Sequence, residues 1–334
     1  MMRVASWRGL SGTPLEYDAW HLGLLGVLTF FVISGFIMMH SFGRFFGEPG
    51  ASIRFWKRRI QRIVPIYWIA TAIAGGLLIV LPHGPPPGLS SWLHSLLFIP
   101  EATAPGQPMR PILGQGWTLN YEMFFYALFG LALLLPRKTG VIALVGTLIG
   151  LVLLGSLIKP LANTRDPYSI ATFYTDPIIG VFGAGVLLAL LWKRWGHLTV
   201  PGGFWLSLLP LAAAQFIFAG ALKHFPLNPY WLPVVWASAV VAVALCIADR
   251  QSLKGRHLKW AVLLGDASYS TYLFHTLTIT ALGKIGQRLP PEWDGVFVVA
   301  AVLASHLVGV FVYRFVETKI SVWFRRIVPR ASYA

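Results

Sequence analysis

Arg58, Arg59 and Arg62 form the part of the sequence best suited to binding a small anion. They belong to RFWKRRIQRIVPIYW (residues 54–68), where five basic side chains lie directly against a long apolar run. Residues three and four apart share one face of an α-helix, so Arg62 is expected beside both other arginines. Arginine suits phosphate because its guanidinium group donates two parallel hydrogen bonds. A simpler role is also open, because basic clusters commonly anchor the cytoplasmic end of a membrane span.

Two ionisable residues within apolar runs are the candidates for acid–base chemistry. Glu122 belongs to GWTLNYEMFFYALFGL (116–131), and His275 ends SYSTYLFH (268–275). Ionisable groups are costly inside a bilayer and often serve a function there. An imidazole titrates near neutral pH, so His275 could accept the proton of a hydroxyl group. The structural alternatives are a Glu122 carboxylate that reaches the outer interface or bonds to a neighbouring helix, and a hydrogen-bonded packing role for His275.

The composition is that of an integral membrane protein. Of the 334 residues, 56% are hydrophobic and only 12% are charged, whereas soluble domains are about one quarter charged. Fourteen Trp and eleven Tyr fit the aromatic belts at the two bilayer interfaces. The formal net charge of +15 does not indicate nucleic-acid binding, because the basic residues lie in short loops between apolar runs.

Several kinds of site lack their usual sequence support. The single cysteine, Cys246, excludes an intrachain disulfide and a multi-cysteine metal site, and we expect no metal. The sequence contains no P-loop, no dinucleotide-binding glycine pattern, no H-E-x-x-H and no G-x-S-x-G. ATP-driven transport and serine-hydrolase chemistry are therefore not indicated.

The apolar runs predict an all-α bundle of about nine transmembrane helices. A span needs roughly 20 mostly apolar residues. The candidate spans are 24–42, 63–82, 117–135, 140–158, 177–192, 204–222, 231–248, 262–283 and 295–316. The short, Pro-rich stretch 86–100 predicts a re-entrant or interfacial segment. Pro65 should bend the chain where a short interfacial helix turns into the second span.

The loops differ in positive charge, which predicts the orientation. The loops on one side, together with the C-terminal end, hold 19 of the 27 Lys and Arg residues. The positive-inside rule places this side, and therefore the C-terminus, in the cytoplasm. The predicted organisation is a polar N-terminal segment (1–23), one membrane domain (24–316) and a cytoplasmic tail (317–334).

Three other residues are given structural roles. Gly35 in ISGF should permit close helix packing. Asp266 lies at the cytoplasmic start of its predicted helix, where its carboxylate would cap the positive end of the helix dipole. Arg314 and Glu317 are three residues apart at the cytoplasmic end of the last span, and an ordinary surface ion pair explains them.

Five stretches occur in an order and spacing typical of one protein family. They are FFVISGFIMMHSF (30–42), RRIQRIVPIYW (58–68), GWTLNYEMFFYALFGL (116–131), LGDASYSTYLFH (264–275) and VYRFVETKI (312–320). Over about residues 22 to 320, the chain resembles the membrane acyltransferase family called acyltransferase type three. That family includes bacterial O-antigen and exopolysaccharide O-acetylases, and its members typically have ten or so spans.

The resemblance implies an activity and assigns roles to the candidate residues. Family members move an acyl group, often acetyl from cytoplasmic acetyl-CoA, to a hydroxyl of a glycan or lipid-linked sugar. The family's Arg-x-x-Arg motif, which is associated with the acyl donor, falls on Arg59 and Arg62, and Arg58 shares their face. Glu122 matches the Glu of a W-S/T-L-x-x-E string, where it would bind the acceptor's hydroxyls or orient a catalytic base. We expect acetyl-CoA as co-substrate, no tightly bound cofactor, and a bacterial inner membrane as the location.

The start of the chain departs from the family pattern. The family's first membrane helix carries an Arg or Lys followed eleven positions later by a His, which is taken to activate the acceptor hydroxyl. Residues 1–23 are too short and polar to span, and eleven positions after Arg3 and Arg8 stand Pro14 and Ala19. The sequence thus predicts that the family's first helix and its catalytic base are missing and that this form transfers little acyl group.

Two histidines could replace the missing base, namely His21 and His275. A different class of function is the alternative, namely a transporter or flippase for a lipid-linked sugar, which inverted repeats with broken helices would favour. A subunit without chemistry would tolerate replacement of Glu122 and His275. We find no internal repeat, so the leading prediction is a membrane O-acyltransferase.

Overall fold

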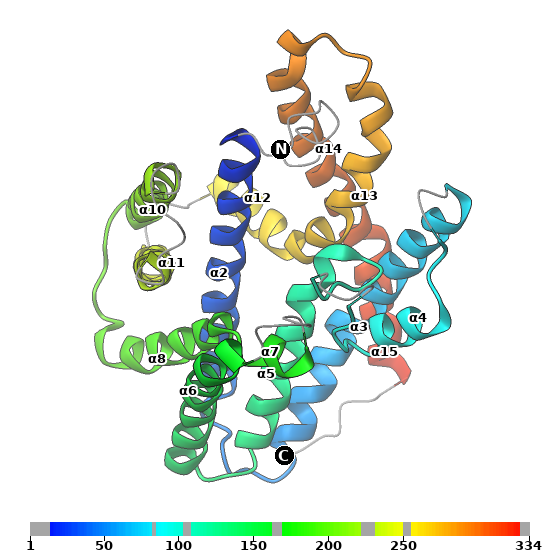
Figure 1. Ribbon diagram of the computed structural model, residues 1–334. Helices are drawn as coiled ribbons and strands as arrows, with labels where there is room; N and C mark the ends of the chain where they lie inside the picture. The colour runs from blue at the N-terminus through cyan, green and yellow to red at the C-terminus, as the bar shows by residue number, and fades with distance from the viewer. Residues whose placement is uncertain are drawn as a thin grey trace. The chain divides into compact units, whose positions relative to one another are not determined.

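The described part of the chain is entirely helical. The computed structural model describes residues 14–81, 85–102, 108–161, 169–221, 231–249 and 255–327 (Figure 1). Within these ranges every regular element is a helix, which confirms the all-α prediction. The chain forms two compact units, the first from residues 1–52 and 121–254 and the second from residues 53–120 and 255–334. The predicted loss of a first membrane helix concerns mainly residues 1–13, which lie outside the described ranges.

The first unit is organised by the tight packing of two helices. Its elements are α2 (Pro14–Phe42), α6 (Arg137–Leu161), α7 (Ile170–Tyr174), η2 (Pro177–Ile179), α8 (Gly180–Trp195), α9 (Gly203–Leu206), α10 (Leu208–Ala221), α11 (Trp231–Ala248) and most of α5 (Trp117–Ala132). A Cβ atom on Gly35 of α2 would overlap the carbonyl oxygen of Phe182, and one on Gly185 of α8 would overlap that of Val32. Small residues let helix backbones approach closely, so the predicted role of Gly35 is confirmed.

The second unit carries the arginine cluster and the end of the described chain. Its elements are most of α3 (Ala51–Val80), α4 (Leu89–Leu96), η1 (Gly114–Gly116), the start of α5, α12 (Gly255–Asp266), α13 (Ser268–Gly286), η3 (Pro291–Trp293), α14 (Asp294–Val312), the π-helix η4 (Tyr313–Glu317) and α15 (Thr318–Ile327). Helices α13 and α14 lie side by side (Figure 1), with Thr271 against Gly309 and Phe297 against Gly286.

Pro65 does not separate an interfacial helix from a span. Helix α3 continues from Ala51 to Val80 and contains Pro65 in its interior. A proline removes one hydrogen bond of the helix, but buried residues on the next turn, Ile66 and Tyr67, hold the chain in place by packing. The arginines therefore lie on the same helix as the apolar run that follows them.

The predicted span at 262–283 is divided near its first residues. Helix α12 ends at Asp266 and α13 begins at Ser268, and the two run in different directions (Figure 1). The N-cap of α13 is Ala267, and no side chain caps this end by a hydrogen bond. The predicted capping role of Asp266 is therefore wrong, because the residue ends one helix instead of beginning the next.

The number of membrane spans is only partly supported. Five described helices are long and apolar enough to cross a bilayer: Leu22–Phe42, Ala51–Val80, Arg137–Ile158, Ile170–Trp195 and Asp294–Trp323. Each of the other predicted spans contains helix, but within the described residues these helices are shorter or less apolar. The chain is thus a multi-pass membrane protein, and the count of nine is not established.

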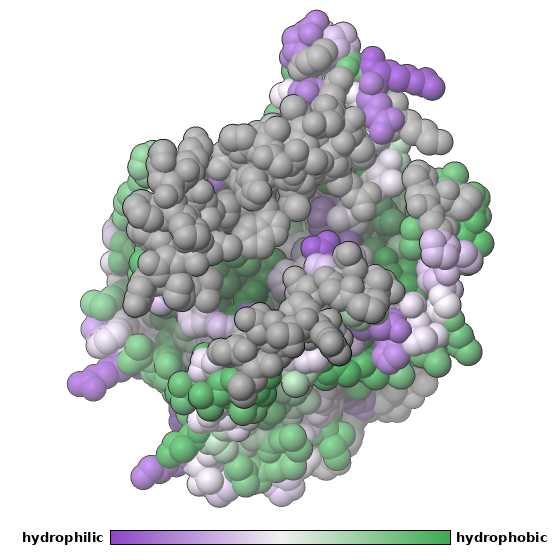
Figure 2. Space-filling view, viewed as in Figure 1, coloured by the Kyte–Doolittle hydropathy of each residue, from purple (hydrophilic) through white to green (hydrophobic). Residues whose placement is uncertain are grey.

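The surface of the helices fits a lipid environment. In Figure 2, apolar side chains make up much of the visible surface around α6. The exposed side chains on this helix include Ile142, Ile149, Leu153 and Leu157. Large exposed apolar patches on a soluble protein would mark interaction sites, whereas on a spanning helix they contact lipid.

The segment 86–100 does not cross the membrane. Its helix α4 has only 8 residues, far fewer than the roughly 20 that a span needs. The segment packs on α3, where Trp68 Nε1 donates a 2.9 Å hydrogen bond to the Leu96 carbonyl oxygen and Tyr67 stacks on Phe98. These contacts hold the segment against the C-terminal half of α3.

Candidate active site

The arginine cluster lies beside the first turn of α13. Arg58 and Arg62 are exposed, and Arg59 is half-buried. The hydroxyl of Tyr269 on α13 donates a 2.8 Å hydrogen bond to the carbonyl oxygen of Ile63, the residue after Arg62. The second unit thus brings the arginines from the beginning of the chain against a helix more than 200 residues later.

The carboxylate of Glu317 contacts the first turn of α13 and is buried, although the sequence predicted it at the surface. The Glu317 side chain is only 7% exposed and accepts a 2.6 Å hydrogen bond from Ser270 Oγ. The charges of Arg62 and Asp266 both act on it. The predicted surface ion pair between Arg314 and Glu317 is therefore wrong. Glu317 ends a π-helix, whose wider turn changes the angular spacing that an α-helix would give the two residues.

His275 has one ring nitrogen engaged by its own helix. Its Nδ1 atom lies 2.6 Å from the carbonyl oxygen of Tyr272. A carbonyl can only accept a hydrogen bond, so Nδ1 carries a proton and donates it. In the neutral ring, Nε2 is then the nitrogen that can accept a proton. This is the tautomer that a general base acting through Nε2 requires.

A polar network joins the surroundings of His275 to the residues before α5. Gln115 Nε2 donates to the Leu273 carbonyl oxygen at 2.7 Å, and Thr276 Oγ1 donates to Gln115 Oε1 at 2.9 Å. The Tyr272 hydroxyl lies 2.7 Å from the Gln115 carbonyl oxygen and 2.6 Å from Thr118 Oγ1. Three positions of α13 are therefore tied to the segment 115–118, namely Tyr272, Leu273 and Thr276. Sequence analysis missed Gln115, whose only signal was its place beside the GWTL string.

The arginine turn of α3 contacts α13 at a different position along the helix axis from that of His275. Tyr269 contacts the arginine turn, and His275 follows six residues later. At 1.5 Å per residue, this places the two about 9 Å apart along the helix axis. Helix α13 thus contacts the arginine turn of α3 through Tyr269 and carries His275 less than two turns further along.

Glu122 belongs to the first unit and is bonded to a neighbouring helix. It is only 5% exposed, and its Oε1 accepts a 3.2 Å hydrogen bond from Ser34 Oγ of α2. The Tyr126 hydroxyl, one turn further along α5, also donates to this oxygen. The carboxylate therefore joins two stretches that carry the resemblance, one around ISGF and the other around WTLNYE.

The family of the chain follows from a match over most of its length. Residues 6–314 match a family model described as an acyltransferase domain. The chain belongs to this acyltransferase family. The resemblance found in the sequence is thereby confirmed, and the protein is an acyltransferase.

The relatives of this acyltransferase include an exopolysaccharide production protein and proteins named as acyltransferases. It is 35% identical over 305 residues to the exopolysaccharide production protein ExoZ of Rhizobium meliloti, covering 89% of each chain. It is 29% identical over 290 residues to the acyltransferase MdmB of Streptomyces mycarofaciens, covering 80% of this chain and 70% of that protein. The O-acetyltransferase OatA of Staphylococcus aureus is 24% identical over 329 residues, covering 89% of this chain and 52% of OatA. No solved structure gives a significant match.

A second histidine of the acyltransferase has a serine and a glutamate beside it. Ser90 Oγ lies 3.0 Å from His94 Nδ1, and Glu101 Oε1 lies 3.2 Å from the same nitrogen. A catalytic relay needs the acid on one ring nitrogen and the nucleophile on the other. Both groups here contact Nδ1, and Ser90 also donates to Glu101 at 2.7 Å. The cluster therefore ties the end of the segment 86–101 to α4 and does not form a triad.

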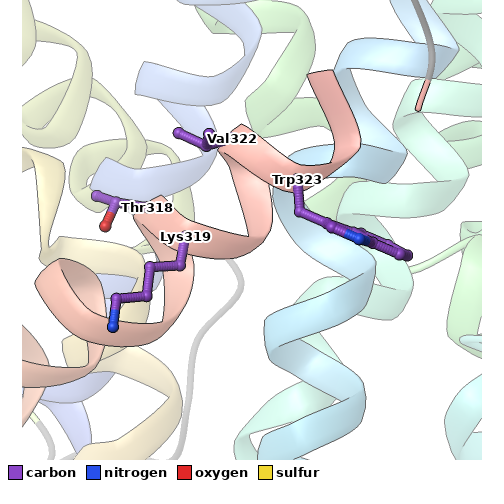
Figure 3. Close-up of a pocket in the computed structure, with 4 residues that line it drawn as sticks. All are labelled: Thr318, Lys319, Val322 and Trp323. Carbon is purple, nitrogen blue, oxygen red and sulfur yellow. The ribbon is translucent and has the colours of Figure 1, made fainter. Parts of the chain in front are cut away.

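The acyltransferase also has an open hollow on α15, away from the predicted residues. Its volume is about 250 Å³, and it is lined by Thr318, Lys319, Val322 and Trp323 (Figure 3). Figure 3 shows that the four lining side chains are spread along one short helix. A ligand site normally buries most of its ligand, so this hollow is not a candidate active site.

Proposed function

We propose that this protein is a membrane O-acyltransferase that moves an acyl group, acetyl in the first instance, from acyl-CoA to a hydroxyl of a cell-surface polysaccharide or a lipid-linked sugar. The observation that carries the proposal is that one helix of the second unit, α13, contacts the arginine turn and also carries His275 with its Nδ1 proton engaged. Family membership supports the reaction class. The name of ExoZ supports a polysaccharide acceptor, and that of OatA supports O-acetyl transfer.

The donor binds at Arg59 and Arg62, with Arg58 as a further contact. Coenzyme A carries a pyrophosphate and a ribose phosphate, and clustered arginines bind such groups by charge-assisted hydrogen bonds. The donor arrives from the cytoplasm of a bacterial cell, because the loops richest in Lys and Arg face that side of the inner membrane. Acyl-CoA is a co-substrate in this proposal and leaves as CoA after each turnover.

His275 acts as the general base. Its Nε2 accepts the proton of the acceptor hydroxyl while the oxygen attacks the acyl carbonyl carbon. The new carbon–oxygen bond forms, the carbon–sulfur bond of the thioester breaks, and the proton on Nε2 passes to the CoA sulfur. The Gln115 network keeps the ring oriented by holding Tyr272, to whose carbonyl oxygen Nδ1 is bonded. Glu122 contributes to acceptor binding through the α2–α5 region.

The proposal is tested with the purified 334-residue chain in liposomes. Radiolabelled acetyl-CoA is supplied with a bacterial exopolysaccharide or with lipid-linked oligosaccharide, and label in the glycan is counted. Transfer of label that is lost in His275→Ala supports the enzyme and the base. Movement of unlabelled glycan across the bilayer without acetylation would support a transporter and contradict the proposal.

A further inference from the structure

Three buried polar side chains of the second unit have no hydrogen-bond partner among the described residues. They are Tyr67 and Thr71 on α3 and Asn120 near the start of α5, and each is at most 1% exposed. In Asn120 both the nitrogen and the oxygen of the side-chain amide are unpaired. Buried polar groups are nearly always hydrogen-bonded, because burial without a partner is unfavourable. These three side chains therefore need an explanation other than stability.

Helix α3 itself leaves the hydroxyl of Thr71 unpaired. A threonine in a helix can donate to the carbonyl oxygen four residues earlier, as Thr278 and Thr280 of α13 do at 3.0 and 2.7 Å. Within the described part of the chain, Thr71 makes no such bond. Tyr67 precedes Thr71 by four residues, so the two side chains lie on the same face of α3. Two unpaired hydroxyl groups thus follow each other along one helix face.

The residues just before α5 hold the Tyr67 hydroxyl at the level of His275. A Cβ atom on Gly116 would lie 3.0 Å from the Tyr67 hydroxyl oxygen, so these two residues are in contact. The preceding residue, Gln115, bonds to α13 on both sides of His275. One short segment therefore joins the unpaired hydroxyl on α3 to the part of α13 that carries the candidate base.

Asn120 adds an unpaired carboxamide to this group of hydroxyls. It comes one helical turn after Gly116 and projects from the same face, which is the face that meets Tyr67. Its side chain offers N–H donors and a carbonyl acceptor, and the two hydroxyl groups can each donate or accept. A secondary amide has the complementary pair, an N–H and a C=O. The three side chains are therefore suited to a ligand that carries a secondary amide.

The arginine turn lies further back along the same helix. Arg62 is five residues before Tyr67, which is about 7.5 Å along the axis of α3. In the proposed function, the phosphates of the acyl donor bind at the arginines and its thioester reaches His275. The part of acyl-CoA between the phosphates and the thioester is the pantetheine arm, which carries two secondary amides. The unpaired groups lie where this arm would run.

We infer that Asn120, together with the hydroxyl groups of Tyr67 and Thr71, binds a secondary amide in the pantetheine arm of the acyl donor. The inference rests on the proposed function and concerns the part of the donor that neither the arginines nor His275 would contact. The hydrogen bonds to the arm replace none within the described protein, because these groups are unpaired. An acetamido sugar of the acceptor also carries a secondary amide, but the position between the arginine turn and the base favours the donor.

The test combines Asn120→Leu with altered donors, using the full chain in liposomes. Acetyl-CoA is compared with two analogues, in each of which one pantetheine amide is replaced by two methylene groups. The wild-type chain should have a KM about tenfold higher for one analogue, since the hydrogen bonds to its amide are lost. Asn120→Leu should raise the KM for acetyl-CoA by a similar factor and should no longer distinguish that analogue from acetyl-CoA.

Measurements of stability separate ligand binding from a structural role. Leucine is close to asparagine in size and has no polar group to bury, so the unfolding midpoint of Asn120→Leu in detergent should equal or exceed that of the wild type. Tyr67→Phe and Thr71→Val each remove one unpaired hydroxyl and should raise the donor KM about two- to fivefold without loss of stability. Ser305→Ala is the control, because this buried hydroxyl is already bonded to the Ala301 carbonyl oxygen at 2.7 Å. It should leave the donor KM unchanged.

The outcomes separate the inference from the proposed function. If the wild type uses both analogues as well as acetyl-CoA, or if Asn120→Leu still discriminates against the analogue, the inference is overturned. Donor binding at Arg59 and Arg62 would then still stand. A lower unfolding midpoint of Asn120→Leu with an unchanged donor KM would show a structural role and would also overturn the inference.

A change confined to the acceptor would identify the other source of the amide. If Asn120→Leu raises the KM only for an acceptor that contains acetamido sugars, Asn120 binds the acceptor and the inference is overturned. If the wild type transfers no acetyl group from acetyl-CoA, the proposed function and the inference are both overturned.

Discussion

At the residue scale, the arginine cluster divides into residues with different surroundings. Arg58 and Arg62 are exposed, whereas Arg59 is half-buried. Tyr269 of α13 bonds to the carbonyl oxygen of Ile63, directly after Arg62. Simple anchoring at a membrane surface needs positive charge but no defined partner, so donor binding is the role to test by substitution.

We expect Arg59→Ala or Arg62→Ala to raise the acetyl-CoA KM about tenfold or more, because each removes a charge-assisted hydrogen bond to phosphate. The measurement is acetyl transfer at a series of donor concentrations, corrected for the amount of inserted protein. Arg314→Ala removes an exposed arginine of the same unit and serves as the control. An unchanged donor dependence in both cluster variants would leave only the anchoring role.

His275 should contribute to turnover and not to donor affinity. We expect His275→Ala to lower kcat by about two to four orders of magnitude, as loss of a general base typically does. His306→Ala is the matched control, because His306 is an exposed histidine whose Nδ1 also bonds to a carbonyl of its own helix, at 2.9 Å. Equal activity of the two variants would exclude His275 as the base.

Glu122 should affect transfer more than it affects protein level. Glu122→Gln keeps the size of the side chain but removes the charge that Ser34 and Tyr126 bond to. We expect transfer to fall about tenfold or more, since hydrogen bonds to a charged group are worth about 1.5–3 kcal/mol. Glu48→Gln changes an exposed carboxylate of the same unit for comparison. Full transfer by Glu122→Gln at normal abundance would make the residue dispensable for the reaction.

At the scale of elements, the contact between α2 and α8 depends on two glycines. A methyl group on Gly35 would overlap a carbonyl oxygen of α8, whereas one on Gly26 of the same helix would meet no atom within 4 Å. The backbone of α8 cannot move aside as the end of a flexible side chain could. The helices must therefore move apart if Gly35 gains a side chain.

We expect Gly35→Ala to destabilise the protein by about 1–3 kcal/mol, the range for an overpacked core, while Gly26→Ala has little effect. The measurement is the unfolding midpoint of each purified variant in the same detergent. Identical midpoints for the two alanine variants would show that α2 and α8 do not approach as closely as described.

At the scale of the whole molecule, the distribution of basic residues predicts the orientation in the membrane. The side with 19 of the 27 Lys and Arg residues carries the C-terminus. We expect a fluorescent protein fused after Ala334 to fluoresce, because such fusions mature in the cytoplasm, and a periplasmic phosphatase fused there to be inactive. An active phosphatase would reverse the orientation and would place the arginine cluster away from cytoplasmic CoA.

The sequence by itself determined the class of the protein and its most local features. Membrane insertion follows from the length and polarity of single segments, and the shared face of the arginines follows from helical spacing. Both can be predicted without knowing which other segments pack against them. The Gly35 prediction also succeeded, because a small residue within an apolar helix has few other uses. The local sequence pattern gave a wrong prediction at Pro65, because packing of the next turn keeps helix α3 continuous there.

Only the tertiary structure decided which polar groups meet. Ser34 and Glu122 are 88 residues apart, Ser270 and Glu317 are 47 apart, and Gln115 and Leu273 are 158 apart. The charge three residues earlier in the sequence, Arg314, gave the wrong partner for Glu317, because a π-turn changed the angular position of the carboxylate. Buried polar groups pair with whatever the packed helices bring within about 3 Å. That distance depends on how the helices cross, which no local pattern of residues records.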